Sequence, residues 1–405
     1  MVKIGIFTFH AISNLGANLQ TLATQQALRY HGCEPVVVNY RPTVGNLGEP
    51  VAQTMEEQHA AHAGFVNKYL KQSELIGSED ELREYCVDEL DGVLVGSDTV
   101  FEFRSKYDPY TLWKWLKTGS LHFSHAVPPY YLNWLKDEDR LFAASIAACG
   151  HGTNHQFAFG GFREGLRRGL SRFSRVTVRD DWTKKMVSGL TGGAVDAEVV
   201  PDPIFSLPLT FTVPEEDRIT EDVSRVVLLS GPFSEAWIGR LREALDARSL
   251  ALWGMANPEN PYEYAATEHN IGLPLSPLKW YQLLSASAGY VGVRFHALVS
   301  CLANNTPIVH TDPYRRSEFF REGSKFYDLC RRAGILDRYF SVRSIQKVAP
   351  EEIASLLYDE SSQARANRYA EYAGKAYLDL IKSLIDQIDA RRDRLVGLKS
   401  ASASG

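Results

Sequence analysis

The stretch GYVGVRFHALVSCLANNTPIVH, residues 289–310, contains the pattern of a strand, a helix and a second strand within one short span. The apolar runs Gly289–Gly292 and Pro307–His310 have the length and composition of buried strands. Between them, apolar residues recur at the spacing of one buried helix face: Phe295, Leu298, Val299 and Leu302. This order predicts a parallel βαβ unit.

The same alternation runs through the rest of the chain. Further strands are expected at Lys3–Phe9, Pro35–Asn39, Gly92–Val95, Leu141–Ala147, Arg175–Val178, Val226–Leu229 and Ala251–Trp253. Helices are expected at Asn18–His31, Phe157–Phe173, Trp182–Gly189, Glu235–Arg248, Pro277–Ser285, Ala297–Asn304 and over much of 350–395. Because helices cover both faces of parallel sheets, apolar strands separated by helices predict a doubly wound α/β fold.

The length of the chain predicts two domains, because its 405 residues exceed what one hydrophobic core normally organises. The segment SLPLTFTVPEEDRITEDVS, residues 206–224, is rich in proline and acids and precedes a new strand. We therefore expect an N-terminal α/β domain over 1–205 and a second α/β domain over 206–345. A helical segment over 346–395 is expected to cross back, and the low-complexity tail 396–405 is expected to be disordered.

Composition and charge argue against several classes of protein. The net charge of −5 at pH 7 is unlike that of a general nucleic-acid binder, which needs a surplus of Lys and Arg. The five cysteines include no CxxC pair, so we expect reduced core residues and neither disulfides nor zinc ligands. The start, MVKIGIFTF, resembles a strand more than a signal peptide, and no apolar run has the roughly 18–20 residues of a membrane helix. The expected location is the cytoplasm.

Two segments do not follow the α/β rhythm. Residues 43–64, TVGNLGEPVAQTMEEQHAAHAG, are expected to form a long polar loop. Residues 101–137 carry many aromatic side chains, which could pack in the core or offer flat faces to a ligand. Loops of this length in α/β proteins are often functional.

Arg294 and His296 lie where the first strand of the opening stretch gives way to the helix. Residues two apart share a face in extended chain but not inside a helix, so the two side chains can act together only at the strand end and the first helical turn. There a guanidinium, an imidazole and free helix N–H groups would surround one anion, with Phe295 anchoring the other side. The alternative is a histidine hydrogen-bonded in the core.

Two other strand ends carry polar residues. After the first strand, FHAISNLGANLQ places Asn14 and Gly16 in a tight turn before a helix, either as a ligand cradle or as a structural turn. The apolar strand in DGVLVGSD ends in Ser97 and Asp98, where open α/β sheets bind ligands. Both residue types also serve as helix N-caps, so that reading stays open.

Further basic residues follow two more strands. Arg179 ends the strand in RVTVRDD and could bind an anion or form a salt bridge with Asp180 or Asp181. Asp202, in VVPDPIF, is expected to cap or pair locally. The basic stretch TDPYRRSEFFR contributes Arg315 either to an anion pocket or to a solvated turn.

In this order, the motifs resemble those of the polysaccharide pyruvyl transferase family. The resemblance rests on Asn-x-Gly-Ala-x-Leu-Gln from Asn14, Gly-Ser-Asp ending at Asp98, Val-Arg at Arg179, Asp-Pro at Asp202 and Arg-Phe-His from Arg294. It extends over about residues 3–335.

The resemblance implies a GT-B-like arrangement of two Rossmann-like domains, with the N-terminal domain on the acceptor side and the C-terminal domain on the donor side. Members move the enolpyruvyl group of phosphoenolpyruvate onto sugar hydroxyls, which leaves a pyruvate ketal and releases phosphate. The expected substrate-binding residues are Asn14, Gly16, Ser97, Arg179, Arg294 and Arg315. His296 would act as general acid, and Asp98 would orient or deprotonate the acceptor hydroxyl.

Two positions depart from the family pattern: Ala17 stands where many members carry an acid, and Thr99–Phe101 replaces the usual Gln-x-Trp. The resemblance implies no cofactor and no metal. Its partners would be phosphoenolpyruvate and a saccharide or lipid-linked saccharide, with peripheral membrane contact through the acceptor. The alternatives are a nucleotide-sugar-dependent GT-B glycosyltransferase and a non-catalytic carbohydrate-binding relative.

Overall fold

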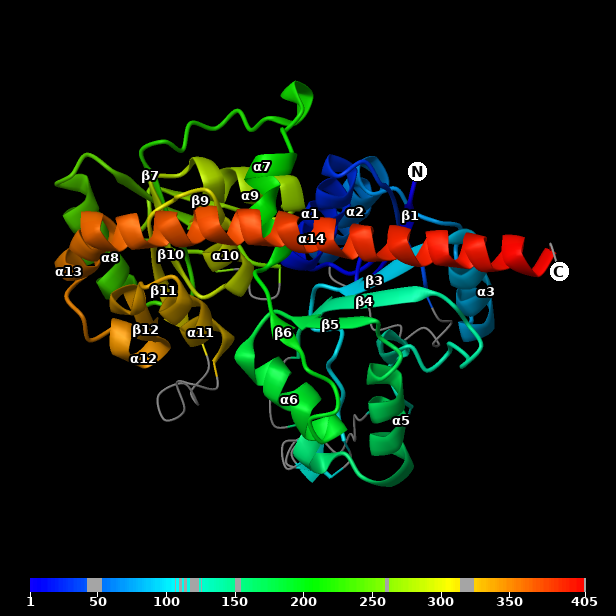
Figure 1. Cartoon of the computed structure of the whole chain (residues 1–405). Helices are drawn as coiled ribbons and strands as arrows, with labels where there is room; N and C mark the ends of the chain where they lie inside the picture. The colour runs from blue at the N-terminus through cyan, green and yellow to red at the C-terminus, as the bar shows by residue number, and fades with distance from the viewer. Residues whose placement is uncertain are drawn as a thin grey trace.

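The computed structural model describes residues 1–41, 53–105, 107–108, 111–112, 115–116, 124, 126–149, 154–258, 262–313 and 324–403. Two parallel sheets, each covered by helices, lie beneath one long C-terminal helix (Figure 1).

The first sheet has the strand order β2-β1-β3-β4-β5-β6, and all of its pairings are parallel. Its strands are β1 (Lys3–Phe7), β2 (Glu34–Val37), β3 (Gly92–Gly96), β4 (Phe142–Ala147), β5 (Arg175–Val178) and β6 (Glu198–Val199). The order reverses between the neighbours β1 and β3. The chains that leave these two strands therefore diverge, which opens the crevice where α/β sheets bind ligands.

The second sheet has the order β12-β11-β10-β7-β8-β9, again fully parallel. Its strands are β7 (Val226–Ser230), β8 (Ala251–Met255), β9 (His269–Ile271), β10 (Gly289–Gly292), β11 (Ile308–Asp312) and β12 (Tyr339–Ser341). Here the order reverses between β7 and β10, so the segment after β10, which carries Arg294 and His296, starts at the switch point of this sheet.

Helices connect the strands on both faces of each sheet. Around the first sheet they are α1 (Leu15–Tyr30), α2 (Gln53–Tyr69), α3 (Glu79–Glu89), α5 (Gly160–Leu170) and α6 (Asp181–Thr191), followed by the short α7 (Leu207–Thr210). Around the second they are α8 (Glu235–Asp246), α9 (Pro277–Ala286), α10 (Phe295–Ala303), α11 (Lys325–Arg332), α12 (Val342–Ile345) and α13 (Pro350–Leu357).

The last helix, α14 (Glu360–Ala403), returns across the molecule from the second sheet to the first (Figure 1). Its Tyr377 hydroxyl lies 3.0 Å from the hydroxyl of Thr24 in α1, and its Ser383 accepts a hydrogen bond from Arg175 of β5. The predicted fold class is confirmed: two Rossmann-like parallel sheets in a GT-B-like arrangement, with the C-terminal helix crossing back. The helix extends to Ala403, into the segment 396–405 for which composition predicted disorder.

Every strand expected from the sequence is present, and β6, β9 and β12 were missed. All three are edge strands of two or three residues. An edge strand pairs on one side only, so it needs no continuous apolar run, and the apolar-run signal is absent there. The five cysteines are buried and none of them forms a disulfide, as expected for reduced core residues.

The prediction of a polar loop over 43–64 is wrong for its second half, because α2 begins at Gln53. Up to residue 64, the fully buried side chains of α2 are polar, Gln58 and His62, and the apolar Phe65 and Val66 follow only in its last turns, which hid the helical period. Gln58 exchanges two hydrogen bonds with the main chain of Leu275, and His62 Nδ1 lies 2.6 Å from Asn18 Oδ1. The first half, 43–52, lies outside the described residues.

The aromatic segment 101–137 divides between core and surface. Phe101, Phe103 and Tyr131 are buried, and the Phe101 and Tyr131 rings stack with centroids 4.9 Å apart. Tyr107 and Trp115 are exposed, while Tyr110, Trp113 and Phe123 lie outside the described residues. Core packing therefore accounts for only part of this segment.

Candidate functional site

His296 packs against the first turn of α1, across the interface between the two halves of the molecule. Asn14 caps α1, its Oδ1 accepting from the N–H groups of Gly16 and Ala17, each at 3.1 Å. Gly16 follows, and a Cβ atom built on it would lie 1.9 Å from His296 Nδ1. Only glycine leaves room for the imidazole, so the structure joins two motifs that the sequence placed far apart.

Arg179, at the end of β5, reaches the same imidazole. Its Nη1 lies 3.3 Å from His296 Nε2. A guanidinium cannot accept a hydrogen bond, so Nε2 is the acceptor and the proton of the neutral ring is on Nδ1. Burial, and then the charges of Arg179, Lys325 and Arg294, hold the pKa of His296 well below its usual range. The imidazole is therefore neutral in this structure.

Arg179 forms a buried ion pair with Asp202, whose Oδ2 lies 3.2 Å from Nη1. Asp202 also accepts from Gln20 Nε2 at 2.6 Å and from the Ile204 N–H at 3.0 Å, so it caps locally as predicted. The predicted salt bridge of Arg179 with Asp180 or Asp181 is not the one that forms. Asp180 instead caps α6 through Thr183, and its neighbour Asp181 pairs with Arg331 of α11.

Two nitrogens of Arg179, Nε and Nη2, are buried and have no hydrogen-bond partner among the residues that the structure describes. The residue is only 2% exposed, so water cannot readily solvate them. The guanidinium carbon lies 4.7 Å from the centroid of the Phe295 ring, a contact that the sequence did not predict. Unpaired buried cationic donors are costly, and an anion would satisfy both.

Lys325, the first residue of α11, is a member of this cluster that sequence reasoning missed. Its Nζ lies 5.0 Å from the Phe295 centroid. Burial and the Arg179 charge lower the pKa of Lys325 to about 8, while Asp98 and Asp180 oppose the shift. The only local signal is the N-cap Ser324 before it, which a lysine at any helix start could follow.

Ser97 and Asp98 leave β3 through a strained turn. Gly96 has φ +121°, and a Cβ there would lie 2.5 Å from the Ile146 carbonyl oxygen, so only glycine fits. The hydroxyl of Ser97 is buried and finds no hydrogen-bond partner in the described part of the chain. Asp98 is buried, its Oδ1 accepts from the Thr99 N–H at 2.7 Å, and its charge raises the pKa of Lys325.

Arg294 takes the N-cap position of α10 with an extended backbone and no side-chain cap. Its charge lowers the pKa of both His296 and Lys325, so its guanidinium faces the same cluster. The structure thus brings together Arg179, Arg294, His296 and Asp98. Arg315 lies outside the described residues, and Asn14 acts on the cluster only through the cap of α1.

A cavity of about 290 Å³ borders this cluster between the N-termini of α6 and α11. Asp180 and Lys325 line its inner end, and Trp182 lines its wall. Trp182 is fixed by its indole N–H, which donates to the Cys149 carbonyl at 2.9 Å. The cavity therefore combines carboxylates, cations and an aromatic face.

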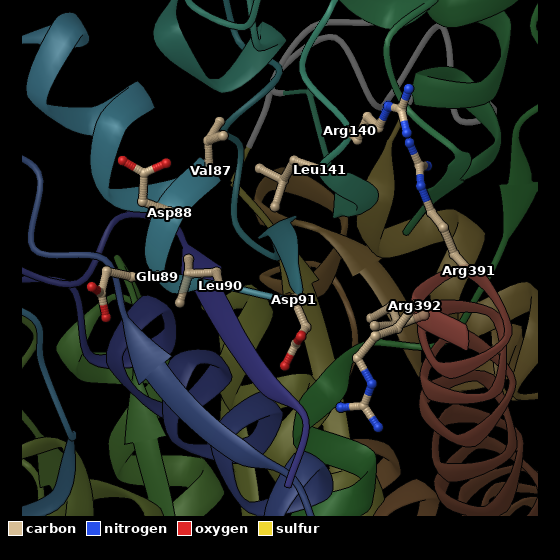
Figure 2. A pocket seen from close by; sticks show the side chains of 10 residues that line it. Val87, Asp88, Glu89, Leu90, Asp91, Arg140, Leu141, Arg391 and Arg392 are labelled. Carbon is tan, nitrogen blue, oxygen red and sulfur yellow. The ribbon is translucent and has the colours of Figure 1, made fainter. Parts of the chain in front are cut away.

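A larger cavity, of about 390 Å³, lies elsewhere, at the amino ends of β3 and β4 beside α14 (Figure 2). Its lining includes Asp91, Arg140 and Arg391. Ligands of parallel α/β sheets bind beyond the carboxyl ends of the strands, so we do not place the active site there.

Among the residues that the structure describes, no group of three or more His, Cys, Asp or Glu side chains is arranged to hold a metal ion. Within the same residues, no helix is both long and apolar enough to cross a membrane.

Fold and site together define an α/β protein with two Rossmann-like parallel sheets and a buried cluster of cationic side chains between them. The chain belongs to the polysaccharide pyruvyl transferase family, whose model matches residues 14–313. The family is one of transferases.

Solved structures with the same overall layout are distant. A putative UDP-N-acetylglucosamine 2-epimerase from Listeria monocytogenes is 12% identical, with 96% of this chain and 97% of that chain covered and a TM-score of 0.49. Arabidopsis thaliana UGT89C1, solved with quercetin, is 11% identical, with 96% and 99% covered and a TM-score of 0.48. At these values the likeness carries no inference about chemistry. No curated protein matches the chain.

Proposed function

We propose that the protein transfers the enolpyruvyl carbons of phosphoenolpyruvate to two hydroxyls of a sugar, forming a pyruvate ketal and releasing phosphate. The observation that carries this proposal is the pair of buried, unpartnered Arg179 nitrogens beside His296. Membership of the pyruvyl transferase family supports the same reaction class.

The donor carries a phosphate and a carboxylate, and the cleft offers three cations to them. Arg179 comes from the first sheet, while Arg294 and Lys325 come from the second half of the chain. A guanidinium binds a phosphate or carboxylate through two parallel hydrogen bonds, and Nε and Nη2 of Arg179 are the pair positioned to do so. The first turn of α10 adds main-chain N–H groups and its positive dipole end.

The reaction balances without any other reactant. A proton added to the methylene carbon makes the adjacent carbon cationic, and one sugar hydroxyl attacks it and loses its proton. The C–O bond to phosphate then breaks, and a second hydroxyl attacks the same carbon and loses its proton. One of the two released protons replaces the proton consumed, and the other leaves with phosphate.

His296 and Lys325 are the candidate acids for the first step. In the free protein, burial and then the neighbouring cations keep His296 neutral, and a bound anionic donor offsets the cationic charge and so raises the pKa of His296. Lys325, with a pKa of about 8, holds its proton at neutral pH. Asp98 is the candidate for orienting or deprotonating an acceptor hydroxyl.

The cavity between α6 and α11 is the place that we assign to the acceptor. It borders Lys325, its volume of about 290 Å³ suits a saccharide unit, and Trp182 offers a ring for stacking. The carboxylates and cations around that ring can hydrogen-bond sugar hydroxyls. A saccharide, free or lipid-linked, is the substrate class that this mixture supports.

The proposal predicts a donor-specific response. Phosphoenolpyruvate at saturating concentration is expected to raise the Tm by about 2–5 °C, because ligand binding stabilises the folded state by mass action. Phosphate release should then require a sugar acceptor. A Tm shift with UDP or GDP but none with phosphoenolpyruvate would instead identify a nucleotide-sugar glycosyltransferase. Saccharide binding without a response to either donor would identify a non-catalytic relative.

A second prediction concerns pH. Because Lys325 loses its charge above a pKa of about 8, kcat/KM for the donor is expected to fall about tenfold per pH unit beyond that value. Lys325→Arg keeps the charge at high pH, since arginine does not deprotonate in this range, so it should remove the decline where Lys325 binds the donor through its charge. Loss of turnover at every pH would instead identify Lys325 as the proton donor, because arginine cannot give up its proton. Lys185→Arg, at the rim of the same cavity, serves as the control and should retain the decline. An unchanged decline in Lys325→Arg would show that another group titrates.

A further inference from the structure

The cavity of about 390 Å³ lies at the amino ends of β3 and β4, where α14 crosses the first sheet (Figure 2). Leu90, Leu141 and Ile388 form an apolar part of its lining. The helix packs closely on the sheet at this point, because a Cβ atom built on Gly92 would lie 2.8 Å from Ile388 Cδ1. The volume is sufficient for a small organic ligand, and none of the residues assigned to the transfer reaction lines the cavity.

Two arginines from distant segments of the chain meet at one end of this cavity. Arg140 precedes β4 and Arg391 belongs to α14, and Figure 2 shows their side chains converging. Among the residues that the structure describes, neither guanidinium forms an ion pair, and Arg391 donates a hydrogen bond to Ser174 Oγ at 3.3 Å. Burial, and then the charges of Arg394 and Arg140, lower the pKa of Arg391. The cations therefore repel one another, and a bound anion would offset that repulsion.

Carboxylates line another part of the cavity. Asp88 and Glu89 lie away from the two converging arginines in Figure 2. Glu89 forms a salt bridge with Lys3 at 3.1 Å, and Asp91 accepts a hydrogen bond from the main-chain N–H of Lys3 at 2.8 Å. Much of this negative charge is thus engaged with Lys3 and not with the arginines. Carboxylate oxygens can accept further hydrogen bonds, which suits hydroxyl groups of a ligand.

We propose that this cavity binds a small phosphorylated molecule that carries hydroxyl groups, with its phosphate between Arg140 and Arg391 and its hydroxyls toward the carboxylates. A guanidinium binds phosphate through two parallel hydrogen bonds. The nearly double negative charge of a phosphate monoester offsets two cations, whereas a single carboxylate offsets one. The ligand would connect the start of β4 with α14 and so stabilise the contact of the C-terminal helix with the first sheet. This proposal goes beyond the transfer reaction, whose groups lie at the opposite edge of that sheet.

The test is calorimetric titration of the full-length protein with glucose 6-phosphate as the probe. We expect the probe to bind about tenfold or more tightly than inorganic phosphate, because its hydroxyls add hydrogen bonds, and glucose alone to show no binding. Arg140→Met and Arg391→Met should each weaken binding of the probe by about tenfold or more, because hydrogen bonds to a charged group are lost. Arg140 is exposed, so its replacement tests the site without disturbing the core.

Three further variants separate this site from the rest of the molecule. Arg168→Met removes the same charge from an exposed position of α5 outside the cavity and should bind the probe as the unchanged protein does. The variant with Arg179→Met and Asp202→Asn lacks the anion-binding donors of the cleft and should also retain full binding. Arg392→Met should have only a small effect, because Arg392 lines the cavity but already pairs with Asp389 at 3.1 Å.

Absence of binding of glucose 6-phosphate to the unchanged protein would overturn the proposal. Unchanged binding in both Arg140→Met and Arg391→Met, with loss of binding in the variant of Arg179 and Asp202, would overturn it as well and place the probe in the cleft. Equal affinity for inorganic phosphate would overturn the part assigned to the hydroxyls. If phosphoenolpyruvate fails to shift the Tm while the probe still binds through Arg140 and Arg391, the proposed function fails and this site stands.

Discussion

Arg179→Met is expected to abolish the thermal response to phosphoenolpyruvate and to lower kcat/KM for the donor by about a thousandfold or more. The side chain provides two buried donors for one anion, and charge-assisted pairs of this kind are the strongest hydrogen bonds in proteins. The substitution also removes the partner of Asp202, and an unpaired buried carboxylate costs about 3–5 kcal/mol of stability. Donor titrations, steady-state kinetics and unfolding curves measure the three effects.

A double variant separates binding from folding. Arg179→Met with Asp202→Asn removes both charges of the pair, so it should recover much of the stability but none of the donor binding. Arg175→Met is the matched control, since Arg175 lies at the other end of β5 and pairs with a Glu198 that is largely exposed. Donor binding by Arg179→Met at the unchanged affinity would refute the assignment of the anion site.

Gly16→Ala is expected to lower kcat by about a hundredfold or more with little change in Tm. The added methyl group would lie 1.9 Å from His296 Nδ1, so the imidazole must move, and misplacing a reacting group by about 1 Å costs about a hundredfold. The backbone itself accepts alanine, because Gly16 is not among the residues with positive φ and alanine favours helices.

The comparison with His296→Ala makes this prediction specific. If Gly16→Ala acts by displacing His296, the variant that carries both Gly16→Ala and His296→Ala should be no slower than His296→Ala alone. Gly161→Ala is the control, because it adds the same methyl group to the first turn of α5, where no atom lies within 4 Å of the new Cβ. Unchanged kcat in Gly16→Ala would mean that the position of His296 against α1 is not needed for transfer.

The sequence alone led us to expect that His296 titrates near neutral pH, as an ordinary histidine does. In the structure, its pKa lies well below the usual range. The sequence placed one arginine beside it, and the structure adds Arg179 and Lys325. Three cations around one imidazole make its protonation depend on the anionic donor. In the proposed reaction, binding of the anionic donor would form this acid by raising the pKa of the buried imidazole.

The sequence alone determined the fold class and most of the strand ends that carry the site. Strands buried on both faces require continuous apolar runs, and helices between them require a 3.6-residue period, so both signals are local. Arg294 and His296 could be placed at a strand-to-helix junction for the same reason. The short edge strands β6, β9 and β12 were missed because each pairs on one side only, and α2 was missed because polar residues fill much of its buried face.

Only the tertiary structure decided which of these residues meet. Gly16 against His296, Arg179 against Asp202, and Lys325 over Phe295 join distant segments of the chain. These contacts depend on how the two sheets face each other beneath α14, and no local period records that. Burial in the resulting interface shifts the pKa values of His296 and Lys325, which makes their chemistry a property of the folded molecule.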